Sequence, residues 1–280
     1  MFKNQLETAF RNLLKYTAYF IPFYVLTVFI LSPDVSLSQE VKEVDKTVPL
    51  KLDGRVLIDT FKGSVNVTTW DKSEVHIHAR IEPGGPSRRE QEWVHDTEIQ
   101  ILHSGNSVRI KTDYDKLRGR KSFFGDSGSN PFVHYTIQMP YSANLDIEDH
   151  KSELNIIDHR SELRIDTHKG VVDVKNQKGS VILETHKGDV RVEFVEFTND
   201  SRFETHKGDI EIVLPKDSKF DLEGDLGSRA HFDSDFEIKI DRSKFRDRGK
   251  QEDEFYIAIN GGGPLLRLST YKGYFRLKKH

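Results

Sequence analysis

Histidine recurs at a nearly fixed spacing in the middle of the 280-residue chain, and each of these histidines follows an acidic residue by two positions. The histidines are His150, His168, His186 and His206, and the acidic residues are Glu148, Asp166, Glu184 and Glu204. Imidazole and carboxylate groups together are suitable ligands for zinc, copper or nickel. A column of these residues along one edge of a repetitive structure is therefore a candidate metal site.

A solvated, charge-balanced face that was copied by duplication is the simpler interpretation of this column. A lysine directly follows each histidine, so the carboxylates would offset the charge of both residue types. Regular spacing along a column does not by itself provide the converging tetrahedral ligands that zinc needs. We favour this interpretation and expect no cofactor.

No other motif predicts a catalytic centre. Residues 125–128 (Gly-Asp-Ser-Gly) are similar to the nucleophile loop of trypsin-like serine proteases, but the following Ser129 and Asn130 depart from that pattern and no matching histidine motif is present. The chain has no cysteine, which excludes disulfides, thiolate zinc sites and cysteine nucleophiles. No pair of acidic residues is set apart as glycoside hydrolysis requires. We predict a protein that is not an enzyme, with a carbohydrate-active β-helix enzyme as the alternative.

A nine-residue repeat over residues 148–212 determines where these side chains lie. Its units include DTHKGVVDV at 166–174 and ETHKGDVRV at 184–192, with one insertion of two residues. Apolar seventh and ninth positions separated by a polar residue are typical of a strand with one buried face. Residues expected in the interior are Ile156, Ile165, Val174, Leu183, Val192 and Ile212. The second position of each unit is also expected to face inward, at Asp158, Thr167, Asn176, Thr185 and Thr205.

These units predict an all-β protein whose single domain is a β-solenoid, or parallel β-helix-like stack of short strands. One unit cannot bury its apolar face alone, but two facing sheets can, so two units would form one coil of about eighteen residues. The coils would stack at about 4.8 Å. Because the corner sequence Thr-His-Lys-Gly recurs, we favour the solenoid over an antiparallel meander or barrel. We expect an amphipathic insert near residues 83–96 and an irregular loop near 115–131.

Residues 1–38 have the pattern of a secretory signal peptide. Lys3, Arg11 and Lys15 precede an uncharged run at 16–31, and the small residues Ser36 and Ser38 follow it. An uncleaved N-terminal membrane anchor is the alternative, although this run is shorter than the roughly 20 apolar residues of a spanning helix. We therefore expect an exported protein that is periplasmic, cell-surface or secreted, with residues 39–280 as its folded domain. Membrane contact is expected only through the N-terminal segment, if it is uncleaved.

Several motifs of the chain resemble those of the bacterial putative adhesin family, exported proteins of β-strand repeats whose function is unknown. The matching residues are Pro140, the Thr-x-Lys-Gly corners, residues 212–215 followed by 220–222, and residues 260–264 with 268–270 and Gly273. The resemblance covers about residues 47–277, and it is densest at 144–222 and 258–277. It implies an exported, parallel β-helix-like fold with a surface or binding role, and it implies no catalytic residue. In many members Ser or Gly stands where this chain has histidine beside lysine.

The charge composition indicates which classes of binding partner to expect. Charged residues make up 31% of the chain, but the net charge is only -3, so the basic bias typical of nucleic-acid binders is missing. We expect no nucleic acid as a partner. We predict an adhesin-like binding or structural module that contacts a protein or a polysaccharide of the cell envelope. An envelope-stress or regulatory accessory protein is a further alternative.

Overall fold

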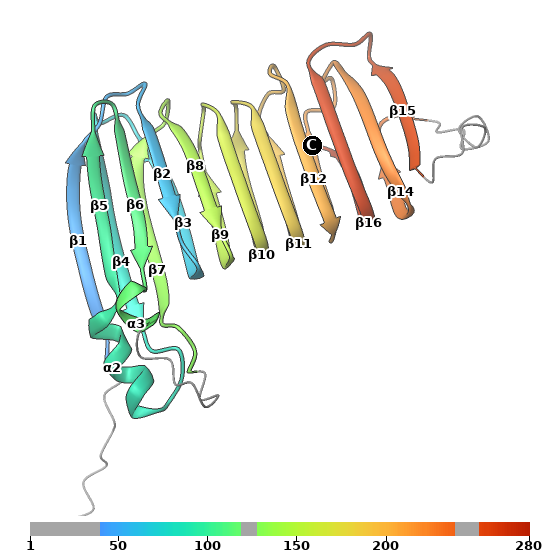
Figure 1. Ribbon diagram of the computed structural model, residues 1–280. Helices are drawn as coiled ribbons and strands as arrows, with labels where there is room; N and C mark the ends of the chain where they lie inside the picture. The colour runs from blue at the N-terminus through green and yellow to red at the C-terminus, as the bar shows by residue number, and fades with distance from the viewer. Residues whose placement is uncertain (1–39, 119–127, 239–251) are drawn as a thin grey trace, which may run out of the picture. The chain divides into compact units, whose positions relative to one another are not determined.

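The computed structural model describes residues 40–118, 128–238 and 252–280, and their strands form a β-solenoid (Figure 1). The first seven strands are β1 (Lys42–Pro49), β2 (Arg55–Asp59), β3 (Lys62–Trp70), β4 (Glu74–Glu82), β5 (Glu98–Ser104), β6 (Ser107–Asp113) and β7 (Phe132–Pro140). The others are β8 (Asn144–Asp149), β9 (Lys151–Ile157), β10 (Leu163–Gln177), β11 (Val181–Phe194), β12 (Ser201–Lys207), β13 (Ile210–Leu214), β14 (Phe220–Ser234), β15 (Glu252–Ile259) and β16 (Leu265–Lys279). The predicted fold class is confirmed. The predicted signal peptide lies outside the described residues.

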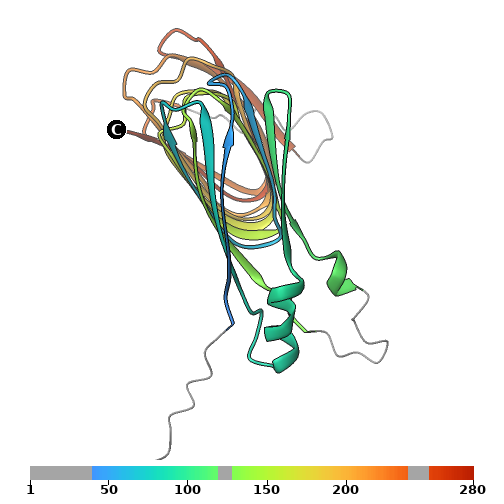
Figure 2. The ribbon, with the colours of Figure 1, turned by 90° about the vertical axis from the view of Figure 1, so that its left-hand side faces the viewer.

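Neighbouring central coils pair in parallel and in register. Leu163 of β10 lies opposite Val181 of β11, an offset of 18 residues (181 minus 163). Thr185 of β11 lies opposite Thr205 of β12, an offset of 20 residues (205 minus 185), which accommodates the two-residue insertion. Figure 2 shows the coils one behind another, each with two facing layers. Each coil therefore adds one rung to each of two sheets, as the repeat predicts.

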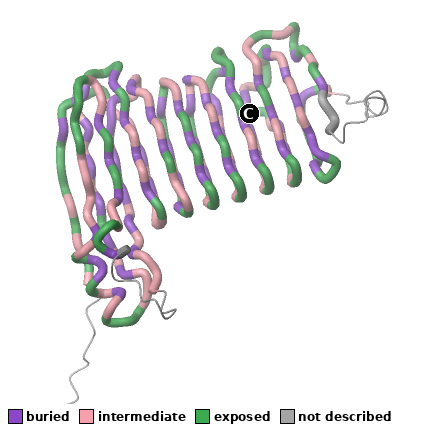
Figure 3. Tube along the Cα trace, in the orientation of Figure 1, coloured by how far each residue is buried: buried purple, intermediate pink, exposed green. Residues whose placement is uncertain are grey.

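The space between the two layers is filled by apolar side chains. All six residues predicted for the interior are at most 1% exposed. Buried and exposed positions alternate along the strands (Figure 3). Burying one such side chain contributes about 1.5–3 kcal/mol to stability, so the repeated alternation is the main source of cohesion between the layers.

The order of the strands departs from the order of the sequence at the C-terminal end. β16 lies between β12 and β14, with Thr270 opposite Thr205 on one side and Leu266 opposite Leu222 on the other. β15 pairs antiparallel with β14. Antiparallel pairs also form the N-terminal end, where β4 pairs with β1 and β7, and β5 with β6. The stack is thus parallel in its centre and antiparallel at its ends, a feature that the repeat does not predict.

Each coil has a second corner, opposite the Thr-His-Lys-Gly corner, and there the prediction of which side chains face inward is wrong. Asp158 and Asn176 have φ angles of 62° and 57° and are exposed, so the prediction that they face inward is wrong. This left-handed conformation turns the next residue inward, and His159 and Gln177 are fully buried. His159 Nε2 donates a hydrogen bond of 2.8 Å to the carbonyl oxygen of Ala143. At the Thr-His-Lys-Gly corner the inward threonines are as predicted: Thr167, Thr185 and Thr205.

The glycine of the Thr-His-Lys-Gly corner is required by contact between coils. Gly188 and Gly208 have φ angles of 155° and 149°, which side chains rarely adopt. A Cβ added at Gly188 would overlap the carbonyl oxygen of Gly170, and one at Gly208 would overlap that of Gly188. A Cβ added at Gly63 or at Gly273, in the first and last of these corners, would likewise overlap a backbone carbonyl oxygen. The glycine column therefore sets how closely successive corners approach.

The predicted insert is present as helix α2 (Arg88–Asp96). Ser87 and Glu90 form a reciprocal capping box at its N-terminus, and Trp93 on the buried face of the helix is fully buried. The predicted irregular loop begins with the short helix α3 (Asp115–Arg118), whereas residues 119–127 lie outside the described part of the chain. Most of the protease-like string at 125–128 lies in that segment as well.

Substitution of Val174 by Asp should destabilise the protein by more than about 4 kcal/mol, because it places a carboxylate between the sheets without a partner. Val171, on the same strand, is 52% exposed and is the matched control. Val171→Asp should cost no more than about 1 kcal/mol, the repulsion from its register neighbours Glu153 and Asp189. Urea unfolding measures both, and equal losses for the two variants would contradict the inward assignment of Val174.

Gly188→Ala should destabilise the fold by about 3 kcal/mol or more, because strain at positive φ adds to overlap with the next coil. Gly105 is the control, since it has a φ of 59° in a tight turn with nothing within 4 Å of an added Cβ. Gly105→Ala should therefore lose only the conformational part, about 1 kcal/mol. Thermal and urea unfolding would disprove the inter-coil contact if the two variants were equally stable.

Candidate functional site

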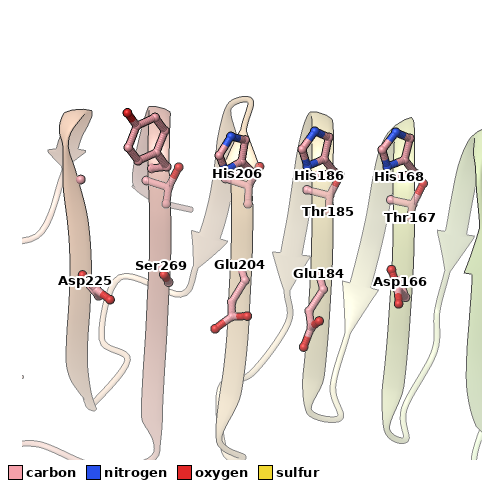
Figure 4. A pocket seen from close by; sticks show the side chains of 14 residues that line it. Asp166, Thr167, His168, Glu184, Thr185, His186, Glu204, His206, Asp225 and Ser269 are labelled. Carbon is pink, nitrogen blue, oxygen red and sulfur yellow. The ribbon is translucent and has the colours of Figure 1, made fainter. Parts of the chain in front are cut away.

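An open groove, here called the ladder groove, runs along the Thr-His-Lys-Gly corner across β10, β11, β12, β16 and β14 (Figure 4). Its volume is about 470 Å³. On four of these strands it is lined by three consecutive residues: an acidic or polar residue, a threonine and a residue with a ring. The lining residues are Asp166, Thr167, His168, Glu184, Thr185, His186, Glu204, Thr205, His206, Ser269, Thr270, Tyr271, Asp225 and Gly227.

The four predicted histidines form the centre of a continuous stack of six rings, here called the aromatic ladder. Centroids of successive imidazoles are 4.9, 4.8 and 5.0 Å apart, and their planes differ by 6°, 3° and 2°. Phe61 stacks on His150 at 4.6 Å, and Tyr271 stacks on His206 at 5.2 Å. Sequence reasoning missed both end rings, although each occupies the histidine position of a Thr-x-Lys-Gly corner.

Stacking leaves only the ring edges of the inner members available to a ligand. Each imidazole from His150 to His206 has a parallel ring on both faces. Ring edges carry the nitrogen atoms, which donate or accept hydrogen bonds. The inner ladder can therefore hydrogen-bond a partner but cannot stack on it.

The predicted acidic residues form a second column on the same outward face. Glu148, Asp166, Glu184 and Glu204 lie opposite one another on successive strands. The column is longer than predicted, because it begins at Asp59 and continues through Ser269 to Asp225. Glu204 accepts hydrogen bonds from Arg202, which raises the pKa of that guanidinium. The groove thus has an acidic side that follows the ladder rung by rung.

A third column, the cation ridge, follows the ladder on its other side and contributes no residue to the groove lining. Its residues occupy neighbouring positions on successive strands, as the strand register and a backbone hydrogen bond from Lys169 to His150 show. They are Lys62, Lys151, Lys169, Lys187, Lys207, Lys272 and Arg229. Burial, and then the charge of Lys151, lowers the pKa of Lys62. The corner therefore presents three parallel columns: acidic, aromatic and cationic.

The parallel arrangement of the imidazoles limits what they offer to a metal ion. A nitrogen lone pair lies in its ring plane, so stacked rings direct their lone pairs along parallel lines that do not meet. Among the described residues, no group of three His, Asp or Glu side chains is placed to hold one ion. As the side chains lie, the column offers contacts from single histidines rather than a tetrahedral site.

The protonation of His186 is opposed by its position in the ladder. Partial loss of water lowers the pKa of His186 below its ordinary value of 6.5, and charges at His168, His206 and the adjacent lysines lower it further. Burial lowers the pKa of His159 at the opposite corner, while its hydrogen bonds to Ala143 and Gln177 act in the other direction. Both imidazoles are therefore neutral at neutral pH.

Fold and site together define a β-solenoid with a repetitive three-column edge and a shallow groove. The chain belongs to the Toastrack family (DUF4097), whose sequence model matches residues 35–273. The family resemblance found in the sequence is thereby confirmed. No curated protein matches the chain. Within the described residues, no helix is both long and apolar enough to span a bilayer.

Several solved structures match the chain at low sequence identity. A putative cell adhesion protein from Clostridium sporogenes is 11% identical, with coverage of 85% of this chain and 100% of its own and a TM-score of 0.43. A putative adhesin from Bacteroides fragilis is 14% identical, covers 85% and 97%, and has a TM-score of 0.35. A putative lipid binding protein from Parabacteroides distasonis is 11% identical, covers 85% and 97%, and has a TM-score of 0.29. Likeness at this level carries no inference about function.

Acid should destabilise the protein through these imidazoles. Because the folded-state pKa values of His186 and His159 are lowered, the unfolded chain binds protons more readily. Their contribution is complete above the unfolded pKa of 6.5 and is lost as the pH falls through the folded values. Urea unfolding between about pH 7.5 and 5.5 should show this loss, and it should be smaller in His186→Gln and in His159→Gln. An unchanged pH dependence in both variants would contradict this origin.

Proposed function

We propose that this protein is an exported, non-catalytic binding module of the cell envelope, and that its ladder groove binds an extended, neutral glycan chain. The observation that supports this proposal is the register of the three columns, because it presents the same set of groups once per coil. A partner with a similar repeat gains an equivalent contact at each rung, so weak contacts add up along its length. Neighbouring strands are about 4.8 Å apart, so the groove repeats these groups at about that interval.

The charges of the groove support a neutral partner rich in hydroxyl groups. Four carboxylates line it, those of Asp166, Glu184, Glu204 and Asp225, whereas the lysines stand on the ridge outside. Carboxylates accept hydrogen bonds from sugar hydroxyls, and the imidazole edges can donate or accept. A polyanion such as a nucleic acid would meet carboxylates along the whole groove, which disfavours it.

The equivalence of the rungs supports binding rather than catalysis. Glycoside hydrolases use two carboxyl groups in different roles at a defined separation. Such a difference depends on distinct environments for the two groups. Here the carboxylates of Asp166 and Glu184 are exposed, occupy the same phase of the repeat and have the same kinds of neighbours. A carbohydrate-active enzyme remains the second candidate because the proposed ligand is the same.

The export part of this proposal rests on residues 1–38. Their order of positive, apolar and small residues is that of a secretory signal peptide. The domain that follows contains no cysteine, so its stability in an oxidising compartment depends on strand pairing and apolar burial alone.

Cellohexaose and chitohexaose, two neutral β-1,4-linked chains, are suitable probes for calorimetry. Affinity should rise with chain length from dimer to hexamer, and polygalacturonate, an anionic chain, should bind more weakly. The double variant Asp166→Asn with Glu184→Gln should lose about tenfold in affinity or more, because hydrogen bonds to charged groups contribute about 1.5–3 kcal/mol each.

Asp189→Asn is the matched control, because Asp189 is an exposed acid of β11 outside the ladder groove. It should bind the hexamers as the native protein does. Failure of the native protein to bind any of these chains would overturn the proposed function. Release of shorter sugars from a hexamer would instead establish the enzyme.

A further inference from the structure

The last rung of the ladder groove is incomplete. β14 pairs in parallel with β16, so that Asp225 lies opposite Ser269 and Arg229 lies opposite Lys272. The register shifts between these pairs, and two residues, Gly227 and Ser228, face the single Tyr271. This rung therefore supplies the acidic and the cationic member of the three columns, but no ring in the aromatic position.

Glycine is required at this position by the same kind of contact that occurs elsewhere in the stack. A Cβ at Gly227 would lie 2.6 Å from the carbonyl oxygen of Tyr271 and 3.0 Å from its Cα. On its other side β14 pairs with β15 from Phe220 to Gly227, which lies opposite Glu252. The backbone thus approaches Tyr271 closely, while no ring from the described part of β14 stacks on that of Tyr271.

The ring of Tyr271 has one face covered and one face open. His206 stacks on one face at 5.2 Å, and no second ring among the described residues packs on the other. Half of Tyr271 is exposed, and both Tyr271 and Gly227 line the groove. The opposite end of the ladder differs, because Phe61 forms a T-shaped pair with Tyr114, with ring centroids 6.1 Å apart and planes at 75°.

We propose that the open face of Tyr271 is a subsite on which one pyranose ring of the glycan stacks, in the place of the missing ring of the ladder. This inference rests on the proposed function and identifies where the glycan is anchored. The C–H face of a pyranose packs against an aromatic ring, while its hydroxyls project from the perimeter. Asp225 and Ser269 lie on one side of the position, and Lys272 and Arg229 lie on the other.

A sugar fits this position better than an aromatic side chain of a partner protein. Polar and charged groups flank the site on both sides, and a pyranose can hydrogen-bond to them while it stacks, whereas a phenyl ring cannot. The site is also continuous with the groove lined by the carboxylate column. One residue of the chain would be held face-on at Tyr271, and the residues beyond it would contact only ring edges.

The subsite can be tested with three variants of the full-length protein and two probes, cellobiose and cellohexaose. Tyr271→Ala should weaken the binding of both probes by about tenfold, the loss expected for one stacked ring. Tyr271→Phe keeps the ring and should bind within about threefold of the native protein. Tyr274→Ala, on the same strand and 44% exposed, should bind normally. Saturation-transfer NMR should show the tyrosine ring protons contacting a single sugar residue.

A fourth variant, Ser228→Trp, puts an indole beside the missing rung and should compete with the sugar without loss of stability, since Ser228 is exposed. If Tyr271→Ala binds cellohexaose as tightly as the native protein does, the subsite is wrong and the groove proposal stands. If the native protein binds neither probe, both proposals are overturned. If Tyr271→Phe is as weak as Tyr271→Ala, the hydroxyl rather than the ring face carries the contact, and the stacking is disproved.

Discussion

The surface of this protein depends on one constraint, the in-register hydrogen bonding of successive coils at a single strand spacing. At the corner, Gly188 approaches the carbonyl of Gly170 so closely that no side chain fits between them. A slip by one residue would turn Val190 and Val192 out of the interior, so the register is fixed on both sides of the corner. Residues at the same phase of the repeat must therefore stack, whatever their chemistry.

Stacking identical residues also stacks identical charges. Lys169 lies opposite Lys187, and Asp166 lies opposite Glu184, and like charges in register destabilise a sheet. The aromatic ladder separates these two columns. Imidazole suits that place because it stacks on its neighbours, and at the centre of the ladder the pKa of His186 is lowered, which favours its uncharged form. A charged residue in place of each histidine would add its charge to either the acidic or the cationic column.

The sequence predicts the parts of the fold that its repeat determines. It does not predict which strands pair when they lie far apart in the chain. The inward apolar positions and the histidine column follow from the repeat, because strand positions at the same phase have the same alternation and units two apart have the same corner. The place of β16 between β12 and β14 depends on pairing across 65 residues (270 minus 205), which no local pattern reveals. The corner motif marks Tyr271 as a position equivalent to the histidines, but the sequence does not show that its ring stacks on His206. Asp158 and Asn176 were misplaced because a left-handed turn, not the alternation, decides their direction.

A stack of equivalent rungs restricts where specificity can arise. Within the regular part, translation by one coil replaces each group with another of the same kind, so a bound chain could shift along the groove with little change in its contacts. Only a break in the repeat distinguishes one position from the next. The bulge at Gly227 and Ser228 is such a break, because it removes a ring while keeping the flanking charges of Asp225 and Arg229. The regular rungs can supply affinity through repetition, whereas the irregular rung at Tyr271 is where a ligand would acquire a fixed register.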